Sequence, residues 1–297
     1  MFQEESMKNF NRKARIIRLI ALPLLCEAAL TACGKISETN SEEHPQLRYT
    51  SFGSGSKTMV VVPGLSTGYV TDNTEALADA FADFTDDYTV YVFDVRDDVP
   101  QGNTISRMGE DLVTAINDLG LKDLYMYGCS MGGMQCIYVA GTYPQLVKKV
   151  AVAASACKGN ETSEGVIGSW IQLAEDNKRN ELTADMGRLI YSPAFYEANK
   201  EAFSAMGDDL TDEMLTRFIN TAKAIIGLDL TKEAAAIKCP VFVIGSQGDR
   251  VLTYRASEKI AEITGGQFYL YGEEYPHAVY DEAPDLRSRV KEFFDQE

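Results

Sequence analysis

Residues 125–133 read Tyr-Met-Tyr-Gly-Cys-Ser-Met-Gly-Gly and lie where a short apolar run gives way to a helical pattern. Gly128, Ser130 and Gly132 fit the pattern G-x-S-x-G, in which a serine occupies a sharp turn between a strand and a helix. The positions two residues before and after the serine crowd each other in such a turn, so both favour glycine. The helix that follows places free N–H groups beside the serine, where they would stabilise negative charge.

The residues on either side of this motif strengthen the prediction, because G-x-S-x-G alone is a weak signal in a chain of 297 residues. Leu124 to Tyr127 is a short apolar run typical of a buried strand. Apolar and small residues then recur at helical spacing from Met134 to Gly141, and Pro144 ends the helix. Strand, turn and helix thus follow one another in the order that the motif requires.

The same alternation of strand and helix extends over most of the chain. Strand patterns are predicted at residues 58–62, 88–93, 124–127, 147–154, 241–244 and 267–271, and helices at 73–81, 105–119, 254–263 and 283–294, besides the helix after the serine. The strands are apolar on both faces, which favours a parallel sheet covered by helices on each side. The predicted fold class is therefore α/β with a mostly parallel sheet.

One long interruption breaks this alternation. Between the strand that ends near Ala154 and the strand that begins near Val241, only helical patterns occur, for example at residues 166–175, 181–191 and 213–226. We therefore expect a helical cap over residues 158–238, inserted between two parts of a sheet domain, residues 48–157 and 239–297. Six cap aromatics could line an apolar substrate pocket, or could instead pack the cap's own core: Trp170, Tyr191, Phe195, Tyr196, Phe203 and Phe218.

The composition excludes some classes of partner. Hydrophobic residues make up 45% and charged residues 24% of the chain, as in ordinary globular proteins. A formal net charge of −16 opposes binding to nucleic acid and to anionic lipid head groups. No metal-site spacing and no glycine-rich phosphate loop is found in the sequence, so we expect no metal and no cofactor.

The N-terminal segment has the layout of a secretory signal. Basic residues between Lys8 and Arg18 precede an apolar run from Leu19 to Cys26, and mostly small residues follow up to Ala32. Leu30 to Gly34 resembles the bacterial lipobox, which implies cleavage after residue 32, lipid attachment to Cys33 and anchoring of an exported protein to the outer face of a membrane. Ser37 to Gln46 is polar and acidic, so we expect residues 33–47 to form a linker.

Two features of this segment leave alternatives open. Glu27 is an acidic residue at the end of the apolar run, where a charge is costly, so an amphipathic N-terminus that is not cleaved is the competing interpretation. Met7 could be the true start, because the basic region follows it directly.

The other four cysteines show no C-x-x-C spacing for redox or metal chemistry. We expect Cys129, Cys136, Cys157 and Cys239 to be small buried hydrophobic residues. Cys157 should end one parallel strand and Cys239 begin its neighbour, which places them at opposite ends of the sheet, so a disulfide between them is not expected.

The order of elements and the G-x-S-x-G turn resemble the α/β-hydrolase fold family over residues 48–294. In that family an acid and then a histidine follow the serine in the chain, each after a strand. The resemblance implies that Asp249, in Gly-Ser-Gln-Gly-Asp-Arg-Val after the strand at 241–244, is the acid, and that His277, in Tyr-Pro-His after the last strand, is the base. The chain has only two histidines, and the other, His44, lies in the linker.

The resemblance also implies an oxyanion hole made by two backbone N–H groups. One belongs to Met131, directly after the serine, and the other to Leu65, in the loop after the strand at 58–62. Relatives often carry His-Gly before the second donor, whereas this chain has Pro63-Gly64. Pro276 likewise replaces the glycine that usually precedes the histidine.

These residues predict a serine hydrolase that cleaves ester, thioester or amide bonds of small acyl substrates through an acyl-enzyme on Ser130. Its activity should rise with pH as His277 becomes free to accept a proton. Peptidase, acyltransferase and carbon–carbon bond hydrolase remain alternatives within the same chemistry. A noncatalytic binding lipoprotein on the same scaffold is the alternative from another class. The sequence makes no prediction of the oligomeric state.

Overall fold

The structure is a computed structural model, and it describes residues 47–296. The predicted signal segment, Cys33 and nearly all of the linker lie outside the described residues. Within 47–296, no helix is both long enough and apolar enough to cross a membrane.

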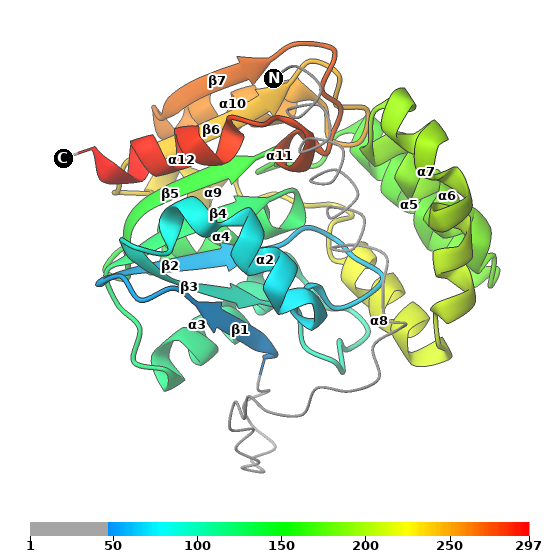
Figure 1. Ribbon diagram of the computed structural model, residues 1–297, viewed down its shortest axis with the longest axis horizontal. Coiled ribbons are helices and arrows are strands. Elements are labelled where there is room, and N and C mark those ends of the chain that lie inside the picture. The colour runs from blue at the N-terminus through cyan, green and yellow to red at the C-terminus, as the bar shows by residue number, and fades with distance from the viewer. Residues whose placement is uncertain (1–46, 297) are drawn as a thin grey trace, which may run out of the picture.

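A seven-stranded sheet forms the centre of the fold (Figure 1). Its strands follow the order β1-β3-β2-β4-β5-β6-β7, and all neighbours are parallel except β1 and β3. The strands are β1 (Tyr49–Phe52), β2 (Lys57–Val62), β3 (Tyr88–Phe93), β4 (Leu124–Cys129), β5 (Val147–Ala153), β6 (Val241–Ser246) and β7 (Gln267–Tyr271). The predicted mostly parallel α/β fold is therefore confirmed, and the antiparallel edge strand β1 is the strand that the sequence pattern did not predict.

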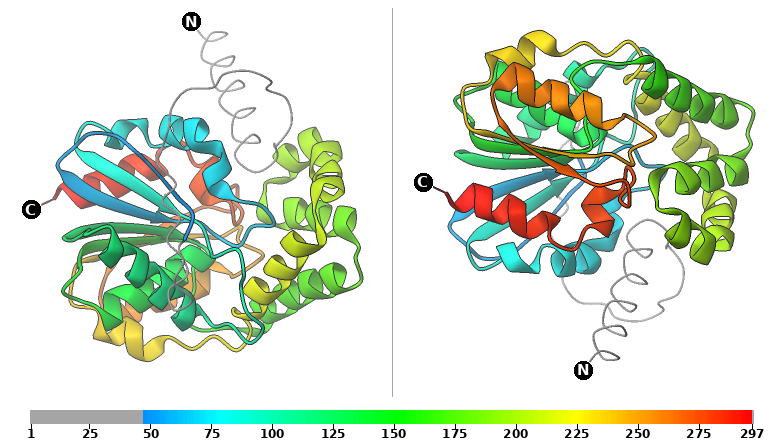
Figure 2. Two further views of the ribbon diagram at one scale, coloured as in Figure 1. Left: turned by 90° about the horizontal axis from the view of Figure 1, so that it is seen from below. Right: turned by 90° about the horizontal axis from the view of Figure 1, so that it is seen from above.

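Helices cover both faces of the sheet (Figure 2). On one face lie α2 (Thr74–Ala80), α11 (Val279–Glu282) and α12 (Leu286–Asp295); on the other lie α3 (Ile105–Asp118), α4 (Met131–Thr142), α9 (Thr231–Ala236) and α10 (Tyr254–Thr264). Short 3₁₀ turns occupy Val70–Asn73, Ala82–Phe84 and Met206–Asp209. Each face has its own buried cluster, because residues of a parallel strand alternate between two covered sides.

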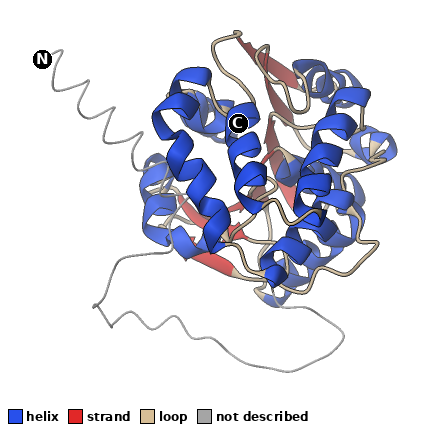
Figure 3. Ribbon diagram, turned by 90° about the vertical axis from the view of Figure 1, so that its right-hand side faces the viewer, coloured by secondary structure: helices blue, strands red, loops and turns tan. Residues whose placement is uncertain are grey.

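Four helices form a cap beyond the carboxyl ends of the strands (Figures 1 and 3): α5 (Glu161–Glu175), α6 (Arg179–Ile190), α7 (Pro193–Ala205) and α8 (Asp212–Lys223). After the cap the chain returns to the helical layer of the sheet, where α9 packs against α4; a Cβ on Gly141 of α4 would collide with the backbone of Glu233. The helical stretches named from the sequence do not include α7. The sequence does contain a signal for its start, because Ser192 is a typical N-cap residue and Pro193 fits the first helical position; in the structure, the Ser192 hydroxyl accepts a hydrogen bond from the Phe195 N–H.

Two details of the sequence prediction were wrong. The last helix begins at Leu286 rather than near residue 283, because a separate short helix, α11, precedes it and a bend containing Pro284 and Asp285 lies between them. Of the four cysteines expected to be buried, only Cys136 and Cys157 are. Cys129 and Cys239 are partly exposed, and all four are free thiols.

Candidate active site

Ser130 lies at the turn between β4 and α4 in a strained backbone conformation. Its φ is 51° and its ψ is −124°, which a residue with a Cβ rarely adopts. The Ser130 N–H donates to the Ala153 carbonyl at 2.9 Å, and the buried Ser155 hydroxyl donates to the Ser130 carbonyl at 2.8 Å. These contacts with the neighbouring strand and the loop after it hold the turn from which Ser130 Oγ reaches the His277 ring.

The two motif glycines are required by close backbone contacts. A Cβ on Gly128 would lie 2.5 Å from the Gly132 carbonyl oxygen, as expected from the crowding across the turn. A Cβ on Gly132 would collide with the Val62 carbonyl oxygen at the end of β2. The second glycine therefore also sets how closely α4 approaches the neighbouring strand.

The structure brings Ser130, His277 and Asp249 together, although 147 residues separate the serine from the histidine. His277 Nε2 lies 2.9 Å from Ser130 Oγ, and His277 Nδ1 lies 2.9 Å from Asp249 Oδ2. The three residues are at most 8% exposed. Asp249 follows β6 and His277 follows β7, so each comes from the carboxyl end of a strand.

The surroundings of Asp249 decide which ring nitrogen carries the proton. Its Oδ1 accepts hydrogen bonds from the N–H groups of Val251 and Leu252, at 2.8 and 3.0 Å. Burial by itself would raise the pKa of Asp249, but the charge of His277, its hydrogen bond and these two N–H donors hold that pKa below its ordinary value. An ionised carboxylate only accepts hydrogen bonds, so Nδ1 of His277 is the donor and Nε2 is left to accept from the Ser130 hydroxyl.

The residues expected to form an oxyanion hole lie beside the serine. Met131 is the first residue of α4, and Leu65 follows Gly64 in the loop after β2. Gly64 packs against Ser130: a Cβ on it would be 3.1 Å from Ser130 Cβ and 3.7 Å from Ser130 Oγ. Within the described residues, the N–H groups of Leu65 and Met131 donate no hydrogen bond, so both are available to an oxygen bound there.

Hydrogen bonds join the cap to the loop that carries His277. The Ala278 N–H donates to the Ile190 carbonyl at 2.8 Å, directly after the histidine. Ser192 donates to the carboxylate of Glu282 through its N–H at 2.9 Å and its hydroxyl at 2.7 Å. The junction between α6 and α7 is therefore fixed to the chain on the C-terminal side of His277.

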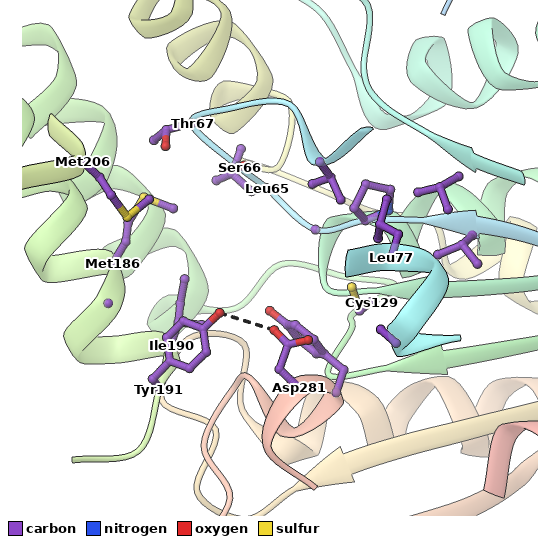
Figure 4. Close-up of a pocket in the computed structure, with 18 of the residues that line it drawn as sticks. Leu65, Ser66, Thr67, Leu77, Cys129, Met186, Ile190, Tyr191, Met206 and Asp281 are labelled. Atoms are coloured by element: carbon purple, nitrogen blue, oxygen red, sulfur yellow. Dashed lines mark hydrogen bonds between the residues drawn. The ribbon is translucent and has the colours of Figure 1, made fainter. Parts of the chain in front are cut away.

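A cavity of about 150 Å³, which we call the cap pocket, lies between the cap and the sheet next to these residues (Figure 4). It borders the serine through Gly64, Leu65 and Cys129, although Ser130 and His277 do not themselves line it. The remaining wall is mostly apolar and includes Met186 and Met206 of the cap and Leu77 of α2. An engineered apolar cavity of this volume holds a benzene molecule, so the cap pocket has room for about six to eight non-hydrogen atoms.

The cap aromatics divide into two groups. Tyr191 and Phe203 line the cap pocket, as the sequence allowed. The other four aromatics pack elsewhere in the cap, so their alternative role in its core holds: Trp170, Phe195, Tyr196 and Phe218.

Sequence reasoning did not identify three further pocket residues: Tyr280, Asp281 and Arg287. A signal was present, because Tyr280 and Asp281 follow His277 within one helical turn.

The Cys129 thiol is partly exposed to the cap pocket, but the surrounding protein shields it from most water and raises its pKa to about 12, so the thiol is uncharged. Within residues 47–296, no group of three or more His, Cys, Asp or Glu side chains is placed to hold a metal ion.

Comparison with known proteins identifies the fold family. The model of the alpha/beta hydrolase fold family matches residues 57–284. The chain is 23% identical to 3-oxoadipate enol-lactonase 2 of Acinetobacter baylyi over 233 residues, which cover 76% of this chain and 84% of that protein. Among solved structures, an α/β hydrolase from a Medee basin deep-sea metagenome library matches with a TM-score of 0.75 and 21% identity, over 84% of this chain and 94% of that one. The enol-lactonase of Burkholderia xenovorans matches with a TM-score of 0.70 and 21% identity, over 84% and 96%.

Proposed function

The chain belongs to the α/β-hydrolase fold family, and from this premise we propose that it is a serine hydrolase that cleaves ester, thioester or amide bonds of small substrates through an acyl-enzyme on Ser130. The observation that carries the proposal is the hydrogen-bonded chain from Ser130 Oγ through the His277 ring to Asp249, with 2.9 Å at each step. Three buried polar side chains from distant segments rarely meet in this order for a structural reason alone.

The proposed reaction uses each group in one role. His277 Nε2 accepts the proton of Ser130 Oγ as that oxygen attacks the substrate carbonyl, and Asp249 stabilises the charge that forms on the ring. The N–H groups of Leu65 and Met131 donate to the carbonyl oxygen as it becomes negative, each worth about 3 to 4 kcal/mol in the transition state. His277 then returns the proton to the leaving group, and water releases the acyl group by the same steps.

The size and lining of the cap pocket support small substrates. A cavity of about 150 Å³ beside Gly64 and Leu65 suits a short or compact acyl group. The activity that the name enol-lactonase gives to relatives is the opening of a lactone, which is a cyclic ester, and it is consistent with ester cleavage.

Labelling and turnover test the proposal together. A fluorophosphonate should modify Ser130 in the folded wild-type protein and leave Ser130→Ala unmodified. The wild-type protein should hydrolyse 4-nitrophenyl butyrate, and the serine variant should lose at least 1,000-fold in kcat, because removing the nucleophile leaves only binding and oxyanion stabilisation. Equal turnover by the two proteins, with no labelling of Ser130, would contradict the proposal and favour the alternative of a noncatalytic binding lipoprotein.

We further propose that the protein is exported and anchored to a membrane through lipid on Cys33, as the lipobox resemblance implies. The test is expression of the full chain in a bacterial host and separation of membrane and soluble fractions. Wild-type protein should be found with the membrane and Cys33→Ala in the soluble fraction. The same distribution for both proteins contradicts this proposal without affecting the catalytic one.

A further inference from the structure

The cap pocket contains one charged pair in an otherwise uncharged wall. Asp281, in α11, and Arg287, in α12, are the only charged side chains among the described residues that line it. Their side chains are 15% and 21% exposed, and Arg287 Nη2 donates to Asp281 Oδ1 at 3.3 Å. Figure 4 shows the Tyr191 hydroxyl pointing toward the Asp281 carboxylate, and this hydroxyl donates to Asp281 Oδ2 at 3.3 Å.

This pair has hydrogen-bonding capacity left over. Both contacts to Asp281 are 3.3 Å long, beyond the usual limits of about 3.2 Å for an N–H donor and about 3.0 Å for an O–H donor, so its oxygens can accept a closer donor. The Nε–H of Arg287 is buried and has no acceptor within the described part of the chain. A buried ion pair whose remaining donors and acceptors are unfilled is poorly compensated for the loss of water.

The charges indicate what could fill this capacity. A carboxylate and a guanidinium together carry no net charge, so the pair does not offset the several kcal/mol that bringing an ion into an apolar pocket costs. An anion in the pocket would be repelled by the carboxylate of Asp281, and a cation would be repelled by the guanidinium of Arg287. A neutral group that both donates and accepts has neither penalty, since it can donate to Asp281 and accept from Arg287 or Tyr191.

We infer that Asp281, Arg287 and Tyr191 form a polar subsite of the cap pocket that selects substrates bearing a neutral hydroxyl or carboxamide group. This inference rests on the proposed function, because it names the substrate class of the same site. The volume of the pocket sets the distance: the polar group lies within a fragment of about six to eight non-hydrogen atoms.

A series of five-carbon fragments tests the head group directly. Pentan-1-ol, pentanamide, pentanoate and pentylammonium share one chain and differ only in the polar group. The alcohol and the amide should inhibit hydrolysis of 4-nitrophenyl butyrate competitively, with inhibition constants at least tenfold lower than those of the two ions. Tighter binding of either ion overturns the inference.

A double variant shows whether the pair is responsible. Asp281→Leu with Arg287→Met replaces both charges by apolar groups of similar size, a change that buried ion pairs often tolerate. It should raise the inhibition constant of pentanamide at least tenfold, because the amide loses both its acceptor on Asp281 and its donor on Arg287. The matched control is Asp285→Asn with Arg289→Met, because this ion pair of 2.7 Å begins one turn further along the chain and does not line the pocket. The control should leave the inhibition constant of pentanamide unchanged; an unchanged constant in the Asp281 variant contradicts the inference.

Calorimetric binding of the same fragments to Ser130→Ala separates this inference from the proposed function. A protein that binds pentanamide at least tenfold more tightly with the Asp281–Arg287 pair than without it, but hydrolyses no ester, has the subsite without the chemistry. A protein that hydrolyses 4-nitrophenyl butyrate but binds pentanamide equally well with and without the pair has the chemistry without the subsite.

Discussion

Replacing Ser130 by glycine should give a more stable protein than replacing it by alanine, the reverse of the usual order. Alanine keeps a Cβ at φ 51° and ψ −124°, and a residue held in such a region costs about 1 to 3 kcal/mol. Glycine adopts this conformation without that cost. Neither variant retains the hydroxyl, so the lost hydrogen bond to His277 cancels in the comparison.

Two smaller effects oppose the gain. Glycine loses about 0.4 to 1 kcal/mol through the greater freedom of the unfolded chain, and removing a buried Cβ costs up to about 0.8 kcal/mol. With strain near the middle of its range, the free energy of unfolding of Ser130→Gly should exceed that of Ser130→Ala by about 1 kcal/mol. Urea denaturation followed by circular dichroism measures it.

A control site gives the ordinary order. Ser169 is exposed and lies in the interior of α5, where glycine should be less stable than alanine by about 1 kcal/mol. The difference between the two sites should therefore be about 2 kcal/mol. If glycine is less stable than alanine at both positions by similar amounts, the turn at Ser130 does not store strain, and the reasoning from its dihedral angles is wrong.

Three further predictions concern the site and its supports. Asp249→Asn should lower kcat for 4-nitrophenyl butyrate by about 100- to 10,000-fold with the fold unchanged by circular dichroism, because the ring loses the acceptor that fixes its tautomer; a loss below tenfold contradicts the assignment. Gly132→Ala should destabilise the protein by about 3 kcal/mol or more in urea, because its Cβ meets the Val62 carbonyl, whereas Gly165→Ala in α5, with open space around it, should be neutral or stabilising. Burial would raise the pKa of Asp295, but hydrogen bonds from two lysines and a tyrosine lower it to about 2, so its stabilisation is present above the unfolded value near 3.9 and is lost as pH falls through about 2. Asp295→Asn should therefore cost at most about 1 kcal/mol at pH 7 in urea denaturation, since this side chain is 34% exposed, and less at pH 3; an equal cost at both pH values contradicts the linkage.

The parts of the site set by local sequence were predictable. The turn at Ser130 was predicted from two glycines and the boundary between a strand and a helix, and all of these signals lie within a few residues of the serine. Asp249 and His277 were found because a parallel sheet places the ends of its strands at one edge, where the structure brings them together. The positions of strand ends thus carried the prediction over long distances in sequence.

Other parts depend on contacts that no local pattern encodes. β1 is four residues long and partly exposed, so it lacks the apolar signature of the central strands. The sequence could not distinguish the cap aromatics that line the pocket from those that pack the cap core, because residues in both positions are equally apolar. Apart from its closeness to His277, nothing in the sequence around Asp281 distinguishes it from the many other acidic residues of the chain. Its place in the pocket wall depends on tertiary contacts with Tyr191 of the cap and Arg287 of α12.

The bonds from Ile190 and Ser192 to the loop after His277 bear on how this enzyme could be engineered. A cap taken from another protein would have to reproduce an acceptor for the Ala278 N–H and a donor for Glu282, or the grafted chimaera would lose the support of His277, the proposed general base. Directed evolution of new specificity is therefore better begun at the methionines on the inner surface of the cap than by exchanging the whole module.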